Sequence, residues 1–322
     1  MQTSHEMFLL AAEETSFTKA ANKAYITQQC LSSHIKRLED YYGVSLFNRT
    51  PKLTLTPAGE LLLQSLRQIE VIEKGIQNEL INTKEGKQGS LTLGINATRA
   101  RILLPDVFCD YHEKFPHVRL SVVLDDAKQL LPLLLNGKID MFVGVNCPSH
   151  ELLARKILKN ERIYMIATRS LLARYGKLPD TGASPGERSI RLSDFPGLPF
   201  VGNNSNSTFN QLIERYLNNW NVQLNMIFFI SDYETQLQFC ARHLAAAFCP
   251  EIVLEKVAAF NRSREAAEQI QVFCLDDLND FLKIELVTHA QAHQPLYMRE
   301  FISLFERFYG ELTDKAVSCL KQ

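Results

Sequence analysis

The pattern of hydrophobic and polar positions divides the chain into a helical first quarter and an alternating helix–strand remainder. In the first quarter, apolar residues recur every three or four positions, the spacing of helices that bury one face. This spacing predicts helices at 4–14, 18–24, 27–42 and 57–84. From Ser90 onward, short apolar runs alternate with helical patterns, which indicates mostly parallel sheets covered by helices.

The helix expected at 27–42 has two distinct faces. Thr27 is suited to capping its start and Gly43 to ending it. Its inward positions are apolar, namely Leu31, Ile35 and Leu38. Its outward positions carry amide, hydroxyl and cationic groups, which can bond to base edges and phosphates of DNA, although an ordinary solvated face would look similar. The candidate DNA contacts on this helix are Thr27, Gln28, Gln29, Ser32, Ser33, Lys36 and Arg37.

An alternating segment with a basic turn follows this helix. Leu46–Phe47 and Leu53–Thr56 flank a turn at Pro51, which is typical of a β-hairpin. The turn adds Arg49 and Lys52 as candidate DNA contacts. A helix-turn-helix followed by a basic hairpin predicts a DNA-binding winged helix in residues 1–57, and this context favours the DNA-binding interpretation of the polar helix face.

A long apolar stripe begins after the hairpin. Thr56-Pro57 is a typical helix start, and the following apolar residues lie three or four positions apart: Leu62, Leu66, Ile69, Ile72, Ile76 and Leu80. Residues 58–86 are therefore predicted to form a linker helix. The stripe could pack within its own domain. We favour pairing with the same helix of a second chain. A dimer would bring two DNA-binding domains to two half-sites of one DNA site, about 34 Å apart.

The remaining pattern predicts an α/β domain over residues 90–310, built as two lobes. We expect lobe I at about 90–161 and 270–310, and lobe II at about 162–269. The whole chain thus combines α+β and α/β architecture. The expected strands are 91–95, 118–124, 141–145, 162–167, 199–202, 226–230, 245–249, 270–275 and 284–288, and the expected helices are 102–115, 127–135, 208–220, 232–242 and 295–309.

Several segments carry a family resemblance. SFTKAA, TQQCLSSHIKRLE, YGVSLFNR and LTLTPAG, in that order, resemble the DNA-binding domain of LysR-type transcriptional regulators. LLLNGKIDMFVGV, at 133–145, resembles the effector domain of that family, which is similar to periplasmic solute-binding proteins. The resemblance implies a sequence-specific regulator that binds a double-stranded DNA operator. It also implies a linker helix that joins chains as a dimer or tetramer, a small-molecule effector between the lobes, and RNA polymerase as a candidate partner.

Polar residues follow several predicted strands at the edge where a ligand would lie. In two-lobed α/β domains, ligands bind at the carboxyl ends of strands, where helix N-termini offer free N–H groups to a carboxylate or another small anion. The resemblance places a ligand-contacting hydroxyl at Thr98. Ser231 is expected to form a capping box with Glu234, while Arg99 and Arg101 either add positive charge or face water. The candidate effector contacts are Asn96, Thr98, Asn146, Asn203, Asn204, Ser205 and Ser207.

Net charge and cysteine content bear on how the protein could attract DNA and on whether it could form disulfides. The net charge is −1, so attraction to DNA must come from local placement of cations rather than from bulk charge. The seven cysteines form no CxxC pair, which argues against a disulfide framework. A redox-sensing regulator that uses Cys240 and Cys249 is an alternative, although both residues lie in apolar patterns.

Motifs of enzymes and membrane proteins do not occur in the sequence. No GxSxG, HExxH, Walker or GxGxxG arrangement is present, so we predict no catalytic residue, cofactor or metal ligand, and an enzyme or a solute-binding module is a weaker alternative. An export signal and a run of about 18 apolar residues do not occur either, so we expect a cytoplasmic protein without membrane association.

Overall fold

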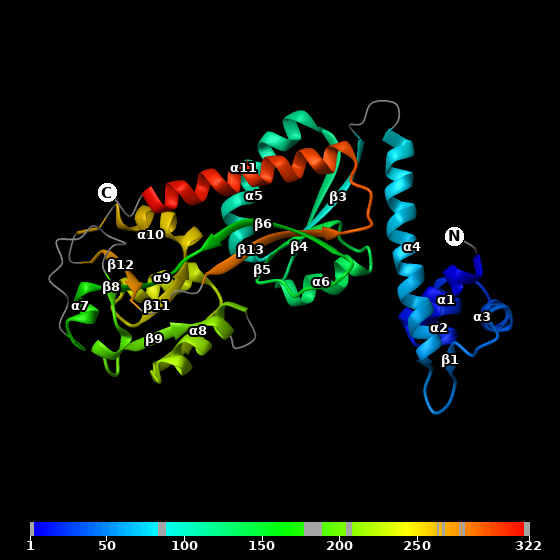
Figure 1. Ribbon diagram of the computed structural model, residues 1–322, viewed down its shortest axis with the longest axis horizontal. Coiled ribbons are helices and arrows are strands. Elements are labelled where there is room, and N and C mark those ends of the chain that lie inside the picture. Colours follow the sequence, from blue (N-terminus) through cyan, green and yellow to red (C-terminus); the bar gives the residue numbers. More distant parts are fainter. Residues whose placement is uncertain are drawn as a thin grey trace.

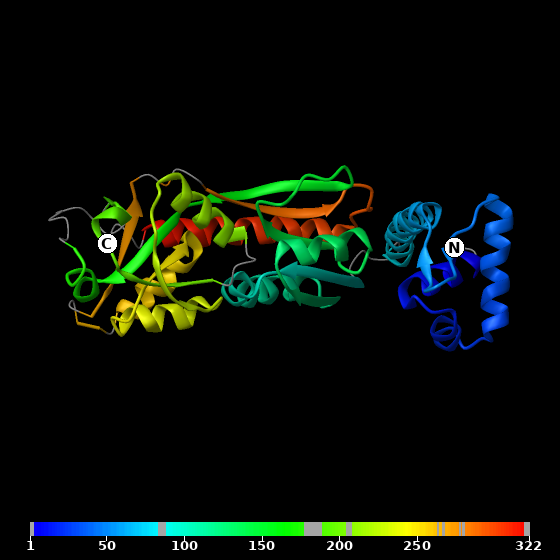
Figure 2. The ribbon, with the colours of Figure 1, turned by 90° about the horizontal axis from the view of Figure 1, so that it is seen from below.

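The computed structural model describes residues 3–82, 88–176, 189–203, 208–262, 264–265, 268–276, 278 and 281–318. Figure 1 shows three parts in chain order: a small N-terminal head (residues 3–55), the long helix α4, and a two-lobed body. Figure 2 shows the head at one end of an elongated molecule and lobe II at the other.

The N-terminal head is a helix-turn-helix with a two-stranded wing, as predicted. Thr27 Oγ1 accepts a hydrogen bond from the Cys30 amide at 3.2 Å, and Gly43 ends α3 with a φ of +68°. The stripe Leu31, Ile35 and Leu38 is buried against the other helices. The elements are α1 (Thr3–Glu14), α2 (Phe17–Lys23), α3 (Gln28–Tyr42) and the antiparallel strands β1 (Phe47–Asn48) and β2 (Thr54–Leu55).

Helix α4 (Pro57–Asn82) carries the predicted apolar stripe, and the burial of its members changes along the helix. Its first turns belong to the core of the head, where Leu66 is 2% exposed. Val71 is buried and contacts the body. The next three members of the predicted stripe are uncovered in this single chain: Ile69, Ile72 and Ile76 are 42%, 39% and 51% exposed. The side chain of Leu80 lies outside the described residues.

Lobe I contains a five-stranded sheet in the order β4-β3-β5-β13-β6. The strands β4, β3 and β5 are parallel, whereas β13 runs antiparallel to β5 and β6. Helices α5 and α11 contribute to the main core of the body, while α6 packs in a separate apolar cluster with β5. The elements are β3 (Gln88–Ile95), α5 (Ala97–Lys114), β4 (His117–Leu124), α6 (Ala127–Leu135), β5 (Met141–Val145), β6 (Leu153–Glu161), β13 (Leu282–His289) and α11 (Leu296–Ser318).

Lobe II contains a six-stranded sheet in the order β10-β9-β11-β7-β12-β8. The chain crosses between the lobes where β6 continues into β7 and where β12 leads to β13 (Figure 1). The elements are β7 (Ile163–Thr168), α7 (Arg169–Leu172), β8 (Ser189–Ile190), η1 (Leu192–Asp194), β9 (Pro199–Gly202), α8 (Thr208–Asn219), β10 (Asn225–Phe229), α9 (Tyr233–Ala241), β11 (Ala246–Pro250), η2 (Glu251–Val253), α10 (Leu254–Asn261) and β12 (Ile270–Leu275).

The body differs from the sequence prediction at β12, α5 and β6. Strand β12 belongs to lobe II rather than lobe I, because it pairs antiparallel with β7. Helix α5 begins five residues before the predicted start at Ile102, because Asn96 caps it. Strand β6 was not predicted, because apolar and polar residues do not alternate along its sequence LARKILKNE.

Among the residues that the structure describes, none of the helices is long and apolar enough to cross a membrane.

Candidate nucleic-acid interface and ligand cavity

The outward face of α3 presents the predicted amide, hydroxyl and cationic groups to solvent. The candidate contacts Gln29, Ser33, Lys36 and Arg37 are exposed on this face. The side chains of Thr27 and Gln28 are also exposed but have partners within the head, since Thr27 caps α3 and Gln28 Oε1 accepts a hydrogen bond from Thr18 Oγ1 at 2.9 Å. Ser32 is half-buried. The available donors and acceptors of this face therefore begin at Gln29 and follow the helix.

The wing is tied to α3 through Glu39. One carboxylate oxygen of Glu39 accepts a hydrogen bond from the Leu46 amide at 2.8 Å, and the other lies 2.9 Å from Arg49 Nη2. The Arg49 guanidinium also lies 5.8 Å from the centre of the Phe17 ring. The Arg49 side chain is still 54% exposed, and Lys52 is exposed. Arg49 is thus held beside the recognition face rather than extended freely, which sequence spacing could not indicate.

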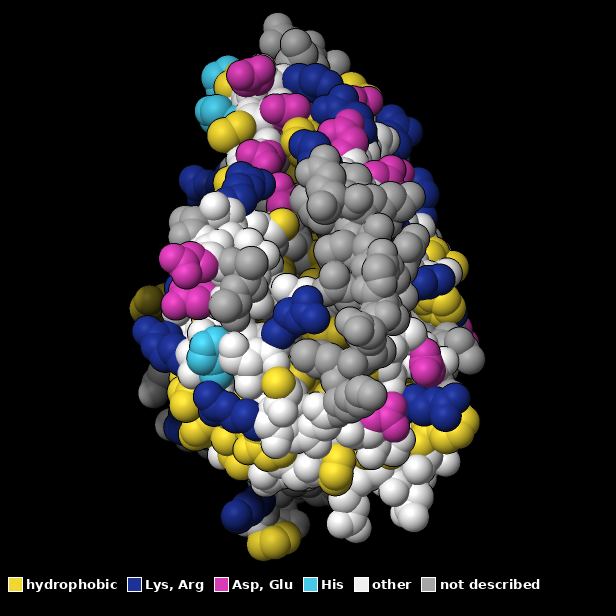
Figure 3. Space-filling view, turned by 90° about the vertical axis from the view of Figure 1, so that its left-hand side faces the viewer, with side chains coloured by type: hydrophobic (Ala, Val, Ile, Leu, Met, Phe, Trp, Pro, Cys, Tyr) yellow, Lys and Arg dark blue, Asp and Glu magenta, His cyan; other side chains and the backbone are white. Residues whose placement is uncertain are grey.

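The opposite end of the molecule has a different charge distribution. Figure 3 shows the end face of lobe II, where the described Lys and Arg side chains are interspersed with Asp and Glu and do not gather in one basic patch. The described residues of this end face therefore do not form a surface suited to phosphate contacts.

A cavity of about 270 Å³ lies between the two lobes. The carboxyl ends of β3, β4, β5, β9 and β11 meet there, together with the starts of α5, α6, α8 and α9. This is the location that the two-lobed pattern predicted for a ligand. The described lining consists of Asn96, Ala97, Thr98, Arg99, Leu124, Asp125, Asp126, Ala127, Val143, Gly144, Val145, Asn203, Thr208, Phe209, Ser231, Tyr233, Pro250 and Leu282.

The structure places three of the predicted effector contacts in this lining. Asn96 caps α5 by accepting a hydrogen bond from the Arg99 amide at 2.9 Å, and half-buried Thr98 follows in the first turn. Asn203 comes from the opposite lobe and is 6% exposed. Gln236 and Tyr233 hold its amide, with Gln236 Nε2 donating to Asn203 Oδ1 at 2.8 Å.

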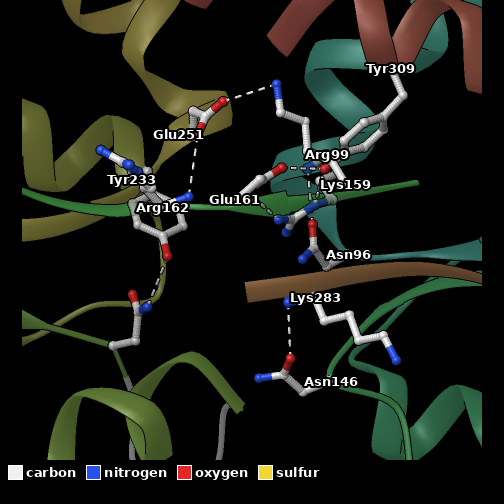
Figure 4. A network of polar contacts seen from close by, with 11 residues as sticks. Asn96, Arg99, Asn146, Lys159, Glu161, Arg162, Tyr233, Glu251, Lys283 and Tyr309 are labelled. Atoms are coloured by element: carbon white, nitrogen blue, oxygen red, sulfur yellow. Dashed lines mark hydrogen bonds and ion pairs between the residues drawn. The ribbon is translucent and has the colours of Figure 1, made fainter. Parts of the chain in front are cut away.

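Other predicted contacts fall elsewhere. Asn146 does not belong to the lining: its Oδ1 accepts a hydrogen bond from the Lys283 amide at 2.9 Å, which joins the residue after β5 to β13 (Figure 4). Its φ of +46° is one that asparagine tolerates better than most residues, so its role here is conformational. Asn204, Ser205 and Ser207 lie outside the described residues.

The prediction that Ser231 caps the start of α9 was wrong. The capping residue is Asp232. Asp232 Oδ2 accepts hydrogen bonds from the Thr235 amide at 3.0 Å and from its hydroxyl at 2.7 Å. The other oxygen of Asp232 lies 2.8 Å from Arg101 Nη1. Because Arg101 is on α5, this exposed ion pair connects the two lobes at the edge of the cavity.

Arg99 lies in a buried polar network rather than facing water. It is 4% exposed, its Nη2 lies 2.8 Å from Glu161 Oε2, and its Nε donates to the Tyr309 hydroxyl at 3.1 Å. Tyr309 in turn donates to the second oxygen of Glu161 (Figure 4). Burial opposes the charge of Arg99, but Glu161 and Tyr309 raise its pKa, so the guanidinium remains protonated.

Two acidic residues in the lining were missed by the sequence interpretation. Asp125 and Asp126 follow β4 at the start of α6. Both are exposed and line the cavity. Partial desolvation of its carboxyl and the neighbouring Asp125 charge raise the pKa of Asp126. A signal was available, because both residues directly follow a predicted strand end. The cavity therefore combines two carboxylates with the Arg99 cation, whose charge Glu161 balances.

The cysteines of the redox alternative are both buried in lobe II. Cys240 and Cys249 are each 0% exposed. Burial raises the pKa of Cys240 to about 12, and burial together with the nearby Cys240 also raises the pKa of Cys249. Reactive cysteines need thiolate character and access to the oxidant, and this environment disfavours both. Among the described residues, moreover, no group of three or more His, Cys, Asp or Glu could hold a metal ion.

Comparison with protein families assigns both parts of the chain. Residues 84–309 match the model described as LysR substrate binding domain, and residues 4–60 match the model described as bacterial regulatory helix-turn-helix protein, lysR family. A probable RuBisCO transcriptional regulator of Thalassiosira pseudonana is 26% identical over 314 residues, covering 95% of this chain and 94% of that protein. The transcriptional regulator AlsR of Bacillus subtilis is 36% identical over 138 residues, covering 42% of this chain and 45% of that protein.

Solved structures show the same fold. A full-length OxyR variant from Pseudomonas aeruginosa is 19% identical with a TM-score of 0.64, covering 96% of this chain and 95% of that one. Full-length CbnR in complex with its target DNA is 18% identical with a TM-score of 0.56, covering 96% of this chain and 100% of that one.

Proposed function

Because this chain belongs to the LysR family of transcriptional regulators, we propose that its α3 and wing recognise an operator while a small molecule bound between the lobes controls that recognition. The observation that carries this proposal is the presence, in one chain, of an exposed recognition face and a polar cavity between two lobes. Gln29, Ser33, Lys36 and Arg37 would contact DNA from α3, with Thr27, Gln28 and Ser32 beside them and with Arg49 and Lys52 on the wing.

The proposed assembly follows from α4. Ile69, Ile72 and Ile76 form an uncovered apolar row, and such a row on a long helix needs a partner. We infer that the same helix of a second chain covers it, so that two heads meet the two half-sites of one operator. CbnR, which shares this fold, is described in complex with its target DNA.

The cavity suits an effector with one acidic group. The free N–H groups at the start of α5 and the Thr98 hydroxyl could bind a carboxylate, with Asn203 reaching it from lobe II. Asp125 and Asp126 would repel a second acidic group placed beside α6. A small molecule with a single carboxylate and neutral or cationic remaining groups is therefore favoured over a dicarboxylate.

Selection from a random duplex library tests the DNA-binding part. The full-length protein should enrich sites with two related half-sites, and Gln29→Ala and Ser33→Ala should relax the base preference at defined positions. Enrichment of sequences no different from the starting library would contradict sequence-specific recognition.

A thermal-shift screen of small carboxylic acids tests the cavity. A binding acid should lose about ten- to a hundredfold in affinity in Thr98→Val, because a hydrogen bond to a charged group is lost. Thr92→Val, on β3 but outside the cavity lining, is the matched control and should bind normally. Wild-type affinity in Thr98→Val would show that this hydroxyl does not contact the ligand.

A further inference from the structure

Helix α6 reaches from the cavity to the N-terminal head. Its N-cap residue Asp126 and its first residue Ala127 line the cavity. Nine residues later the helix ends, and the turn Asn136–Lys138 leads into β5. Figures 1 and 2 both show α6 beside α4. A single short helix therefore has one end at the proposed effector site and the other at the helix that carries the head.

The turn after α6 is in direct contact with α4. A Cβ placed on Gly137 would lie 3.0 Å from Val71 Cγ2, so the backbone of the turn packs closely on this α4 side chain. Val71 is 8% exposed, although its neighbours on α4 at 69 and 72 are uncovered. Gly137 has a φ of +65°, a conformation that glycine adopts without strain.

The same turn contacts the head itself through Glu13. Lys138 Nζ lies 3.8 Å from Glu13 Oε1. Glu13, at the end of α1, also binds Arg67 of α4 and lies 3.8 Å from Lys23 Nζ of α2. Burial alone would raise the pKa of Glu13, but Arg67, Lys138 and Lys23 together lower it. One carboxylate thus joins α1, α4 and lobe I.

Helix α6 packs closely on the sheet of lobe I. Leu130 and Leu134 are 0% and 1% exposed and belong to a cluster separate from the main core of the body. Two glycines let the helix approach the sheet: a Cβ on Gly94 would meet Leu130 at 2.7 Å, and one on Gly144 would meet Ala127 at 2.9 Å. Such close packing transmits a shift along the helix rather than absorbing it.

We propose that α6 couples the cavity to the head, with the turn Asn136–Lys138 as its contact on Val71 and Glu13. This inference rests on the proposed effector function, and it names how the cavity regulates DNA recognition. A ligand that displaces the start of α6 changes the packing of the turn and with it the position of the head relative to lobe I. Coupling between two sites is reciprocal, so DNA on the head must also change α6.

This reciprocity allows a test that needs no identified effector. Hydrogen exchange of the full-length protein is followed by mass spectrometry with and without a mixed-sequence 40-base-pair duplex at low salt. In the wild type, duplex binding should protect α3 and change exchange rates of the amides of α6 by at least about fivefold, the lower end of typical allosteric coupling. In Lys138→Glu, which faces Glu13 with a like charge, the α6 response should fall by at least about half while α3 remains protected.

Lys128→Glu is the matched control, because Lys128 is exposed on α6 but is remote from the turn. It makes the same charge change and should keep the wild-type α6 response. Protection of α3 without any change in α6 in the wild type would overturn the inference while leaving DNA binding intact. An α6 response of wild-type size in Lys138→Glu would overturn the role of the turn. If α3 itself showed no protection, DNA binding and the inference would both be contradicted.

Discussion

Arg49 has two roles in the head: it positions the wing, and it is a candidate contact to a DNA phosphate. Its guanidinium pairs with Glu39 at 2.9 Å and lies over Phe17, which positions the wing against α3. At 54% exposure it also remains available to a phosphate. A contact to DNA must therefore compete with, or extend, an ion pair already present in the free protein.

Arg49→Ala should weaken binding to all duplex sequences alike, because a phosphate contact carries no base information. The slope of log affinity against log salt should fall in magnitude by about one. Fluorescence anisotropy at several salt concentrations measures both quantities. Arg242→Ala removes an exposed arginine of lobe II and should change neither, and unchanged binding of Arg49→Ala would remove the wing contact from this description.

Residue environment also predicts the reactivity of the thiols. Cys30 and Cys109 are exposed, whereas Cys240 and Cys249 are buried with raised pKa values. A thiol reagent should modify the exposed pair in the native protein and the buried pair only after unfolding. Peptide mass spectrometry identifies each site. A Cys240–Cys249 disulfide after mild peroxide treatment would instead revive the redox alternative.

At the scale of elements, helix α4 has three different environments: the core of the head, a contact with lobe I, and solvent. Leu66 packs in the head, Val71 contacts lobe I, and the row at 69, 72 and 76 is left uncovered. Leu66 and the row at 69, 72 and 76 follow one another along one side of the helix, because they are spaced three or four positions apart, whereas the intermediate Val71 points elsewhere. The uncovered row is what separates a dimerising helix from one that only supports its own domain.

Ile69→Asp should reduce the size of the assembly, because an unpaired charge in an apolar interface is costly to bury. Light scattering of the full-length protein measures this directly. Gln64→Asp adds the same charge at an exposed position of α4 and should leave the size unchanged. An Ile69→Asp protein with the wild-type mass would mean that α4 does not mediate the main contact between chains.

At the scale of the whole molecule, the buried network ties α5, the crossover from β6 to β7, and α11 together. Arg99, Glu161 and Tyr309 come from these three elements and meet beside the cavity (Figure 4). Such a network contributes specificity more than net stability, but removing one charge leaves the other buried and unpaired.

Glu161→Gln should therefore lower the free energy of unfolding by about 3–5 kcal/mol, as measured by urea denaturation. Asp110→Asn is the matched control, since Asp110 and Arg307 also connect α5 and α11, at 3.3 Å, but are 48% and 53% exposed. That exposed pair should be worth less than about 1 kcal/mol. Equal losses in the two variants would show that burial of the network has no energetic importance.

The amino-acid sequence by itself determined the parts that depend on neighbouring residues. The cap at Thr27, the stop at Gly43 and the stripe of Leu31, Ile35 and Leu38 set the limits and inward face of α3. The wing and the alternation of strands and helices in the body follow from similarly local patterns, and so does the placement of Thr98 and Asn203 after strand ends.

Only the tertiary structure decided which distant residues meet. Arg99 finds partners 62 and 210 positions away, so nothing near it in the sequence distinguishes a buried ion pair from a solvated arginine. Likewise, β12 belongs to lobe II because its backbone pairs with β7, and Lys138 reaches Glu13 only because the turn after α6 contacts α4 at Val71. Caps and periodicity are local properties of the chain, whereas charge pairing, strand partners and contacts between domains depend on how separate segments are brought together in space.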